Sequence, residues 1–240
     1  MKFAVQLYTL REHIKNGDDL LEILGKVKQI GFDGVEFAGY FDLSAETLKA
    51  RLDELELTPI GTHMGLKNYA PENLDATLEF GKTVGFKYMG VGGAAHSTKE
   101  ECMHIGKTLG NATKAAKDLG ITMYYHNHSE EFYPIENGEL PIDIIKSLTK
   151  LQLDTYWSFN AGVDNYKFLT ENKDDVALIH IKDGIDGSPV ALGEGQNDLA
   201  AVVKAAKEIG IDWLILENDN PSPDGLSDIT RSMNWLKANA

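Results

Sequence analysis

Cysteine and basic residues are scarce in this sequence. Cys102 is the only cysteine among 240 residues, so no internal disulfide can form, and we expect a protein of the reducing cytoplasm. Lysine and arginine total 23 against 37 acidic residues, which gives a net charge of −14. A field of this sign repels nucleic-acid backbones and anionic membranes, and it suits a small-molecule substrate or a metal cation.

Long apolar runs and several common catalytic motifs are also missing. The first apolar stretch is interrupted at Gln6 and ends at Arg11, too short for a signal peptide or a membrane-spanning helix. No G-x-G-x-x-G follows the first expected strand, and no P-loop, nucleophile elbow or kinase motif occurs. Without a cysteine cluster, a cysteine-type zinc site is excluded.

The sequence does contain a regular alternation of strand and helix patterns. Eight segments with strand character are expected at 2–10, 32–39, 58–65, 86–93, 121–128, 151–160, 176–184 and 212–219. An amphipathic helix pattern follows each of them, and glycine ends several of these helices just before the next strand. Eight such units predict a single α/β domain over residues 1–240, a (β/α)8 TIM barrel, with an open doubly wound sheet as the alternative.

Polar side chains gather where the expected strands end. In a TIM barrel the C-terminal strand ends form the active site, and a polar residue inside an apolar strand is costly unless it has a partner. The residues found there include Glu36, His63, His126, His128, Asp154, Trp157, His180, Lys182 and Glu217. We therefore expect one shared polar centre.

Three of these residues indicate a metal site. Asp154, His180 and Glu217 end three consecutive expected strands, and imidazole together with carboxylate suits Mn²⁺, Zn²⁺, Co²⁺ or Fe²⁺. A single histidine at a strand end is usually a hydrogen-bonded structural residue, so the prediction depends on the set rather than on any one member.

Several segments resemble the sugar phosphate isomerase/epimerase superfamily of xylose isomerase-like TIM barrels. They are "GFDGVEF", "YYHNHSEEF", "LDTYWSFNAGVD", "IHIKDG" and the stretch from "ALGEG" to "LILEND". The "YHNH" run is similar to one large subgroup. The resemblance extends over essentially the whole chain, and it implies one divalent ion, Mn²⁺, Zn²⁺, Co²⁺ or Mg²⁺.

The resemblance also implies roles for individual residues. Relatives hold the metal with Glu, Asp, His and Glu from strands 5 to 8, and Asp154, His180 and Glu217 match the last three. The strand 5 position departs, because His126 stands where many relatives have glutamate. We expect His126 to be the fourth ligand and His128 to contact substrate, with the reverse left open.

Further roles follow from the positions of these residues near the proposed metal site. Glu217 and Lys182 are the expected catalytic residues, Lys182 contacting a substrate oxygen. Glu36, His63 and Trp157 are expected to bind substrate.

The implied activity is isomerisation or epimerisation of a ketose, keto-sugar or cyclitol by proton abstraction beside a carbonyl, through an enediolate. The missing strand 5 glutamate leaves the second acid–base group open among His126, His128, Glu36 and Glu131. A lyase or dehydratase using the same site is one alternative, and a catalytically inactive sugar- or partner-binding barrel is another. The net charge argues against a DNA-repair activity like that of endonuclease IV. Oligomeric state has no signal in the sequence.

Overall fold

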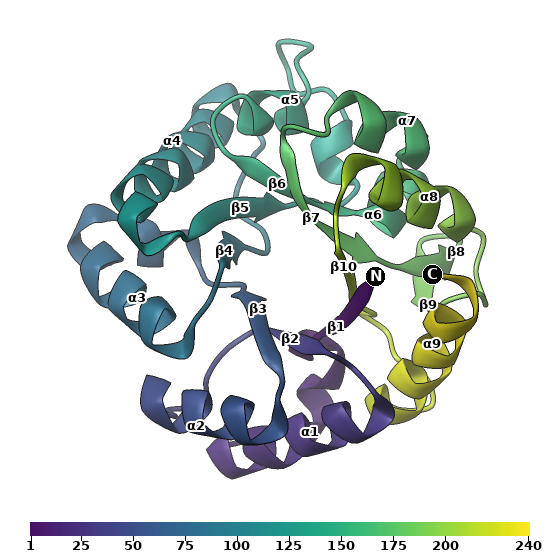
Figure 1. Cartoon of the computed structure of the whole chain (residues 1–240). Helices are drawn as coiled ribbons and strands as arrows, with labels where there is room; N and C mark the ends of the chain where they lie inside the picture. Colours follow the sequence, from purple (N-terminus) through teal and green to yellow (C-terminus); the bar gives the residue numbers. More distant parts are fainter.

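Eight parallel strands form the centre of the protein in the computed structural model, which describes residues 1–240 (Figure 1). They are β1 (Lys2–Gln6), β2 (Gly34–Phe37), β3 (Thr58–Thr62), β4 (Tyr88–Val91), β5 (Thr122–His126), β6 (Lys150–Asp154), β7 (Val176–Ile181) and β10 (Trp213–Leu216). The strand order is β3-β2-β1-β10-β7-β6-β5-β4, and a bridge between His63 and Gly90 joins the two ends. The predicted (β/α)8 TIM barrel is confirmed.

Helices surround the strands as an outer ring (Figure 1). They are α1 (Gly17–Ile30), α2 (Ala45–Leu55), α3 (Pro71–Val84), α4 (Lys99–Ala115), α5 (Pro141–Lys146), α6 (Thr155–Asn160), α7 (Asn165–Glu171), α8 (Leu199–Ile209) and α9 (Gly225–Asn239). Short 3₁₀ turns lie at Leu7–His13, Leu66–Tyr69, Lys117–Leu119 and Glu130–Phe132. Side-chain caps define several helix starts. At α2, for example, the Thr47 amide donates to Ser44 Oγ at 3.2 Å.

All eight strands end earlier than the sequence pattern predicts, and β1 and β6 do so by the most, each at a polar residue that caps the next turn. Gln6 ends β1, because its side-chain oxygen accepts from the Tyr8 amide at 3.2 Å and starts a 3₁₀ turn. Asp154 ends β6 in the same way and starts α6, so the apolar residues after it are helical. An apolar run alone does not distinguish a strand from a short buried helix.

The loop after β7 also contains structure that the sequence pattern did not predict. Residues 183–190 form a small antiparallel hairpin of β8 (Asp183–Ile185) and β9 (Ser188–Val190).

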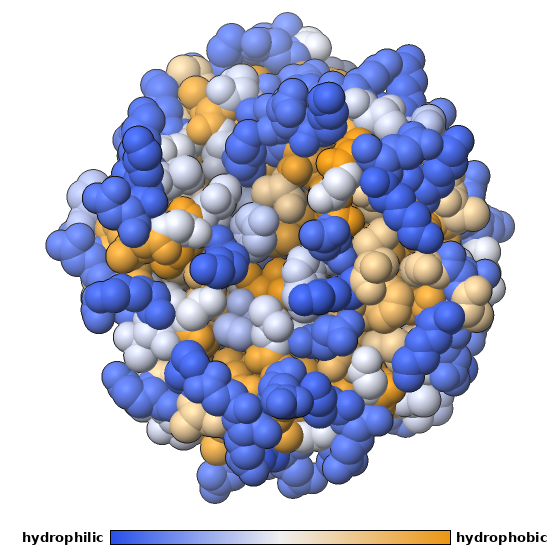
Figure 2. Space-filling model, viewed as in Figure 1, coloured by the Kyte–Doolittle hydropathy of each residue, from blue (hydrophilic) through white to orange (hydrophobic).

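The apolar core has two parts. A large cluster lies between the strands and the helical ring, and a small one fills the barrel interior with Ala4, Ile60, Tyr124, Leu178 and Ile215. Hydrophilic residues cover much of the outer ring, with apolar residues in smaller patches between them (Figure 2). None of the helices has the length and apolar character that crossing a membrane requires.

Gly90 leaves the space that the Tyr124 ring fills. A Cβ at this position would lie 2.5 Å from Tyr124 Cδ2 and still closer to the neighbouring ring carbon. We expect Gly90→Ala to lower the free energy of unfolding by about 1–3 kcal/mol through overpacking, measured by urea denaturation. Gly65→Ala is the control, since its Cβ would come no closer than 3.6 Å to any side chain. Equal stability of the two variants would contradict this account.

Candidate active site

Four metal-competent side chains converge at the C-terminal end of the barrel. His126 and Asp154 end β5 and β6, His180 lies near the end of β7, and Glu217 follows β10. The parallel register pairs Asp154 with His180 and His180 with Ile215, so the side chains meet at one level. All four are buried, and one ligand atom from each lies within 4.8 Å of the others. The four residues that the sequence and the resemblance predicted as ligands are thus brought together.

Gln152 determines which nitrogen of His126 is free. Its amide nitrogen donates to Glu36 Oε1 at 2.7 Å, so its oxygen faces the histidines. That oxygen lies 2.7 Å from His63 Nε2 and 3.1 Å from His126 Nδ1, and both nitrogens act as donors. His126 Nε2 therefore keeps its lone pair. Burial, reinforced by the His180 charge, holds the pKa of His126 well below its usual range, so the ring is neutral.

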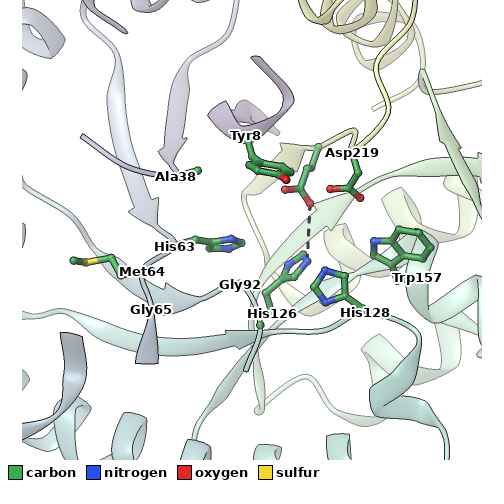
Figure 3. A pocket seen from close by; sticks show the side chains of 12 residues that line it. Tyr8, Ala38, His63, Met64, Gly65, Gly92, His126, His128, Trp157 and Asp219 are labelled. Atoms are coloured by element: carbon green, nitrogen blue, oxygen red, sulfur yellow. Dashed lines mark ion pairs between the residues drawn. The ribbon is translucent and has the colours of Figure 1, made fainter. Parts of the chain in front are cut away.

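The free His126 nitrogen faces two carboxylates. His126 Nε2 lies 3.8 Å from Asp154 Oδ2 and 3.9 Å from Glu217 Oε2, and the second contact is drawn in Figure 3. Asp154 Oδ1 is already used, because it accepts from the amides of Tyr156 and Trp157 at the start of α6. Only Oδ2 of Asp154 is directed toward the cluster. Burial raises the pKa of Asp154, and Lys182 opposes that effect.

Both nitrogens of His180 face carboxylate oxygens. Nε2 lies 2.5 Å from Glu36 Oε2, and Nδ1 lies 3.0 Å from Glu217 Oε2. A neutral imidazole carries one N–H only, so the second contact requires either a second proton or a cation. Burial disfavours the charged ring, yet Glu36 and Glu217 raise the pKa of His180 to about 10. A metal ion on Nδ1 would replace that second proton, and Nε2–H would then donate to Glu36, a carboxylate being a usual partner of a metal-bound histidine.

Glu36 lies below the cluster and is fully buried. Its oxygens accept from Gln6, Gln152, Tyr124 and His180, the first two at 2.7 Å. Burial would raise its pKa, but the histidines His63 and His180 lower it to about 2. Although we expected Glu36 to contact substrate, it does not line the cavity.

Lys182 is fully buried among three carboxylates. Its Nζ lies 3.0 Å from Asp154 Oδ2, 2.9 Å from Glu217 Oε2 and 2.5 Å from Asp219 Oδ2. Burial alone would lower the pKa of Lys182, but these carboxylates, Asp154 first, raise it. Asp219 was not among the predicted site residues. It lies two residues after Glu217, as Lys182 lies two residues after His180, and this spacing is the signal in the sequence that could have found it.

A cavity of about 590 Å³ opens above the cluster (Figure 3). It is lined by Tyr8, Ala38, His63, Met64, Gly65, Gly92, Gly93, His126, His128, Trp157, Glu217 and Asp219. Of the predicted site residues, His63, His126, His128, Trp157 and Glu217 line the cavity. Asp154, His180, Lys182 and Glu36 lie beneath its surface. Tyr8 and Trp157 provide aromatic faces on different sides of it (Figure 3).

Two buried acids shape the loops instead of the cavity. Glu131 accepts from the Tyr125 hydroxyl and the His128 amide, both at 2.7 Å, so it fixes the turn that carries His128. Asp183 accepts from the amides of Gly193, Gly195 and Asn197 at 2.9–3.0 Å and so folds back the loop after β7. No residue of 184–198, the loop after β7, lines the cavity.

The chain belongs to the family of xylose isomerase-like TIM barrels, whose model matches residues 24–239. Among solved structures, a sugar phosphate isomerase/epimerase from Parabacteroides distasonis superimposes with a TM-score of 0.80 at 20% identity, covering 99% of this chain and 98% of that one. An L-ribulose 3-epimerase structure superimposes with a TM-score of 0.77 at 17% identity, covering 100% of this chain and 94% of that one.

The IolI protein with a bound zinc atom gives a TM-score of 0.77 at 19% identity, over 99% and 97% of the chains. At these identities the likeness shows the fold alone. Among curated proteins, none matches this sequence.

Glu36→Gln tests the buried anchor. The change removes one of the two charged partners of His180 and places an amide N–H among donors, so we expect about 3–5 kcal/mol lower free energy of unfolding. Urea denaturation of the protein without added metal measures it. Glu79→Gln, an exposed helical acid, is the matched control and should change stability by less than about 0.5 kcal/mol. A loss no larger than that of the control would contradict the anchoring role.

Proposed function

We propose that this protein is a divalent-metal-dependent isomerase or epimerase that acts on a ketose, keto-sugar or cyclitol by removing a proton beside a carbonyl. The observation that carries the proposal is the convergence of four potential ligand atoms beneath an open cavity. They are His126 Nε2, Asp154 Oδ2, His180 Nδ1 and Glu217 Oε2. Mixed nitrogen and oxygen donors of this kind suit Mn²⁺, Zn²⁺ or Co²⁺. When bound, the ion would polarise the substrate carbonyl and stabilise negative charge on its oxygen.

Glu217 is the proposed base. Its Oε2 is taken up by His180 and Lys182, whereas its Oε1 accepts no hydrogen bond from the protein and the side chain lines the cavity. A carboxylate oxygen placed in this way can take the proton from the carbon beside the carbonyl. Lys182 lies beneath the cavity surface with its ammonium against three carboxylates, so it would stabilise the charge that develops on the substrate oxygen through its field and not by direct contact.

The remaining cavity residues are proposed to bind and orient the sugar. Trp157 and Tyr8 offer faces that pack on the apolar side of a sugar ring. The Arg11 guanidinium lies 4.2 Å from the Tyr8 ring centroid on one side of the ring and restrains it. His63 and His128 would contact hydroxyl groups. Glu36 is reassigned from substrate contact to positioning, because its acceptor sites are filled by protein donors.

A lyase or dehydratase with the same metal site is the second candidate. Two of the four groups considered for the second acid–base role, Glu36 and Glu131, lie outside the cavity and are hydrogen bonded within the protein. The two carboxylates that line the cavity, Glu217 and Asp219, both follow β10, so they approach the substrate from one side. Elimination needs only one base and an acid, whereas epimerisation would draw its second group from the histidines.

The reaction class can be tested by solvent exchange. Wild-type protein with Mn²⁺ is incubated in D₂O with a panel of ketoses, 3-keto-glycosides and inososes, and NMR follows deuterium at the carbon beside the carbonyl. We expect exchange with at least one member and a loss of about 100-fold or more in Glu217→Gln. An inverted centre indicates epimerisation, a moved carbonyl isomerisation, and an unsaturated product elimination. No exchange with any member would overturn the proposal and favour a binding barrel.

The metal ligands can be tested separately. We expect Asp154→Asn and His180→Ala to lose the ion, measured by elemental analysis after dialysis against metal-free buffer. Excess metal should raise the melting temperature of the wild type but not that of these variants. At a metal concentration of 100 times Kd, binding adds about 2.7 kcal/mol to the free energy of unfolding of the wild type. Asp164→Asn, at another helix N-cap, and His104→Ala, on α4, are matched controls that should retain metal. Retention in both ligand variants would contradict the proposed set.

A further inference from the structure

The ammonium of Lys182 lies on the same oxygen atoms that a metal ion at the proposed site would use. It contacts Asp154 Oδ2 at 3.0 Å and Glu217 Oε2 at 2.9 Å. The other oxygen of Asp154 caps α6, so Asp154 has only this one to offer either cation. Because two cations that share carboxylate oxygens repel each other strongly in a buried site, occupancy by one weakens the hold of the other.

A third carboxylate gives the ammonium another partner. Asp219 Oδ2 lies 2.5 Å from Lys182 Nζ, and Asp219 is not among the four proposed ligands. Its side chain is 29% exposed and lines the cavity. Its backbone oxygen accepts from Arg11 Nη2 at 2.6 Å, so the loop that carries it is tied to the start of the barrel.

We propose that Lys182 is a built-in cation that pairs Asp154 and Glu217 in the metal-free protein. In this proposal, binding of a divalent ion ends the contacts of the ammonium with Asp154 and Glu217 and leaves it paired with Asp219 alone, at the cavity. The inference rests on the proposed metal site and adds the order of events there. Metal binding thereby leaves Lys182 and Asp219 as an ion pair beside the substrate cavity. Competition with Lys182 thus weakens metal binding, but it also keeps the buried carboxylates paired with a cation when no metal is bound.

Direct measurement of metal affinity tests this inference without any substrate. Mn²⁺ binding to chelator-treated protein is measured by isothermal titration calorimetry at one pH for the wild type, Lys182→Met and Lys182→Arg. We expect Lys182→Met to bind Mn²⁺ about tenfold or more tightly, since the competing charge is gone. Lys182→Arg keeps the charge and should stay within about threefold of the wild type. Lys99→Met, which removes a surface ammonium paired with Glu139, is the control and should not change affinity.

The role of Asp219 is tested by a double-mutant cycle. If the ammonium moves to Asp219, Asp219→Asn leaves it on the ligand carboxylates and weakens Mn²⁺ binding in the wild-type background. The same change in Lys182→Met should weaken binding at least about threefold less. Equal effects in both backgrounds would overturn the transfer to Asp219.

The outcomes separate this inference from the proposed function. Mn²⁺ binding by the wild type with no tightening in Lys182→Met overturns the built-in cation while the metal site stands. Binding by neither protein removes the metal site itself, and the cation role with it. Binding by Lys182→Met alone supports the competition in its strongest form. Circular dichroism checks folding, and Lys182→Gln, which keeps a polar end group, replaces Lys182→Met if that variant does not fold.

Discussion

The hydrogen-bonded carboxylate of Glu36 is the interaction on which the site depends. This buried carboxylate accepts hydrogen bonds from four side chains on four strands: Gln6 on β1, Tyr124 on β5, Gln152 on β6 and His180 on β7. A buried ion is costly unless it is paired and fully hydrogen bonded, and this one is both. Two of these donors belong to the proposed site. The hydrogen bonds to Glu36 therefore also fix the His180 imidazole and the Gln152 amide, which orients His126. The same set of contacts therefore stabilises the barrel and determines the geometry of the site.

Charge balance connects this anchor to the cavity. The C-terminal end of the barrel buries more carboxylates than lysines. A second proton on His180, which lies between two of these carboxylates, reduces the excess negative charge. Apart from the neutral His126, each proposed ligand already contacts a positive group, either a proton on His180 Nδ1 or the Lys182 ammonium. Such a cluster is poised for exchange of one kind of cation for another, because none of its carboxylates has to be desolvated anew.

The sequence predicts the fold well because the barrel is repetitive. Eight strand–helix units each carry their own pattern, and an error in one strand end, as at Gln6 or Asp154, leaves the topology unchanged. The ligand candidates were also predictable, since Asp154, His180 and Glu217 each end a strand. Contacts made by side chains from distant units were not. Neither the donors around Glu36 nor the pairing of Lys182 with Asp219 follows from spacing, because they depend on the radial position of each side chain in the closed barrel.

The lining of the cavity has a consequence for ligand charge. Its acidic members are Glu217 and Asp219, and no arginine or lysine lines it, since Lys182 lies beneath the surface. A phosphate ester would bring a dianion toward two carboxylates with no guanidinium to receive it, and its field would oppose entry before any contact forms. A neutral polyol meets no such barrier. On this pattern of charge we expect the cavity to favour neutral polyols over phosphate esters, before the arrangement of hydroxyl groups has any effect.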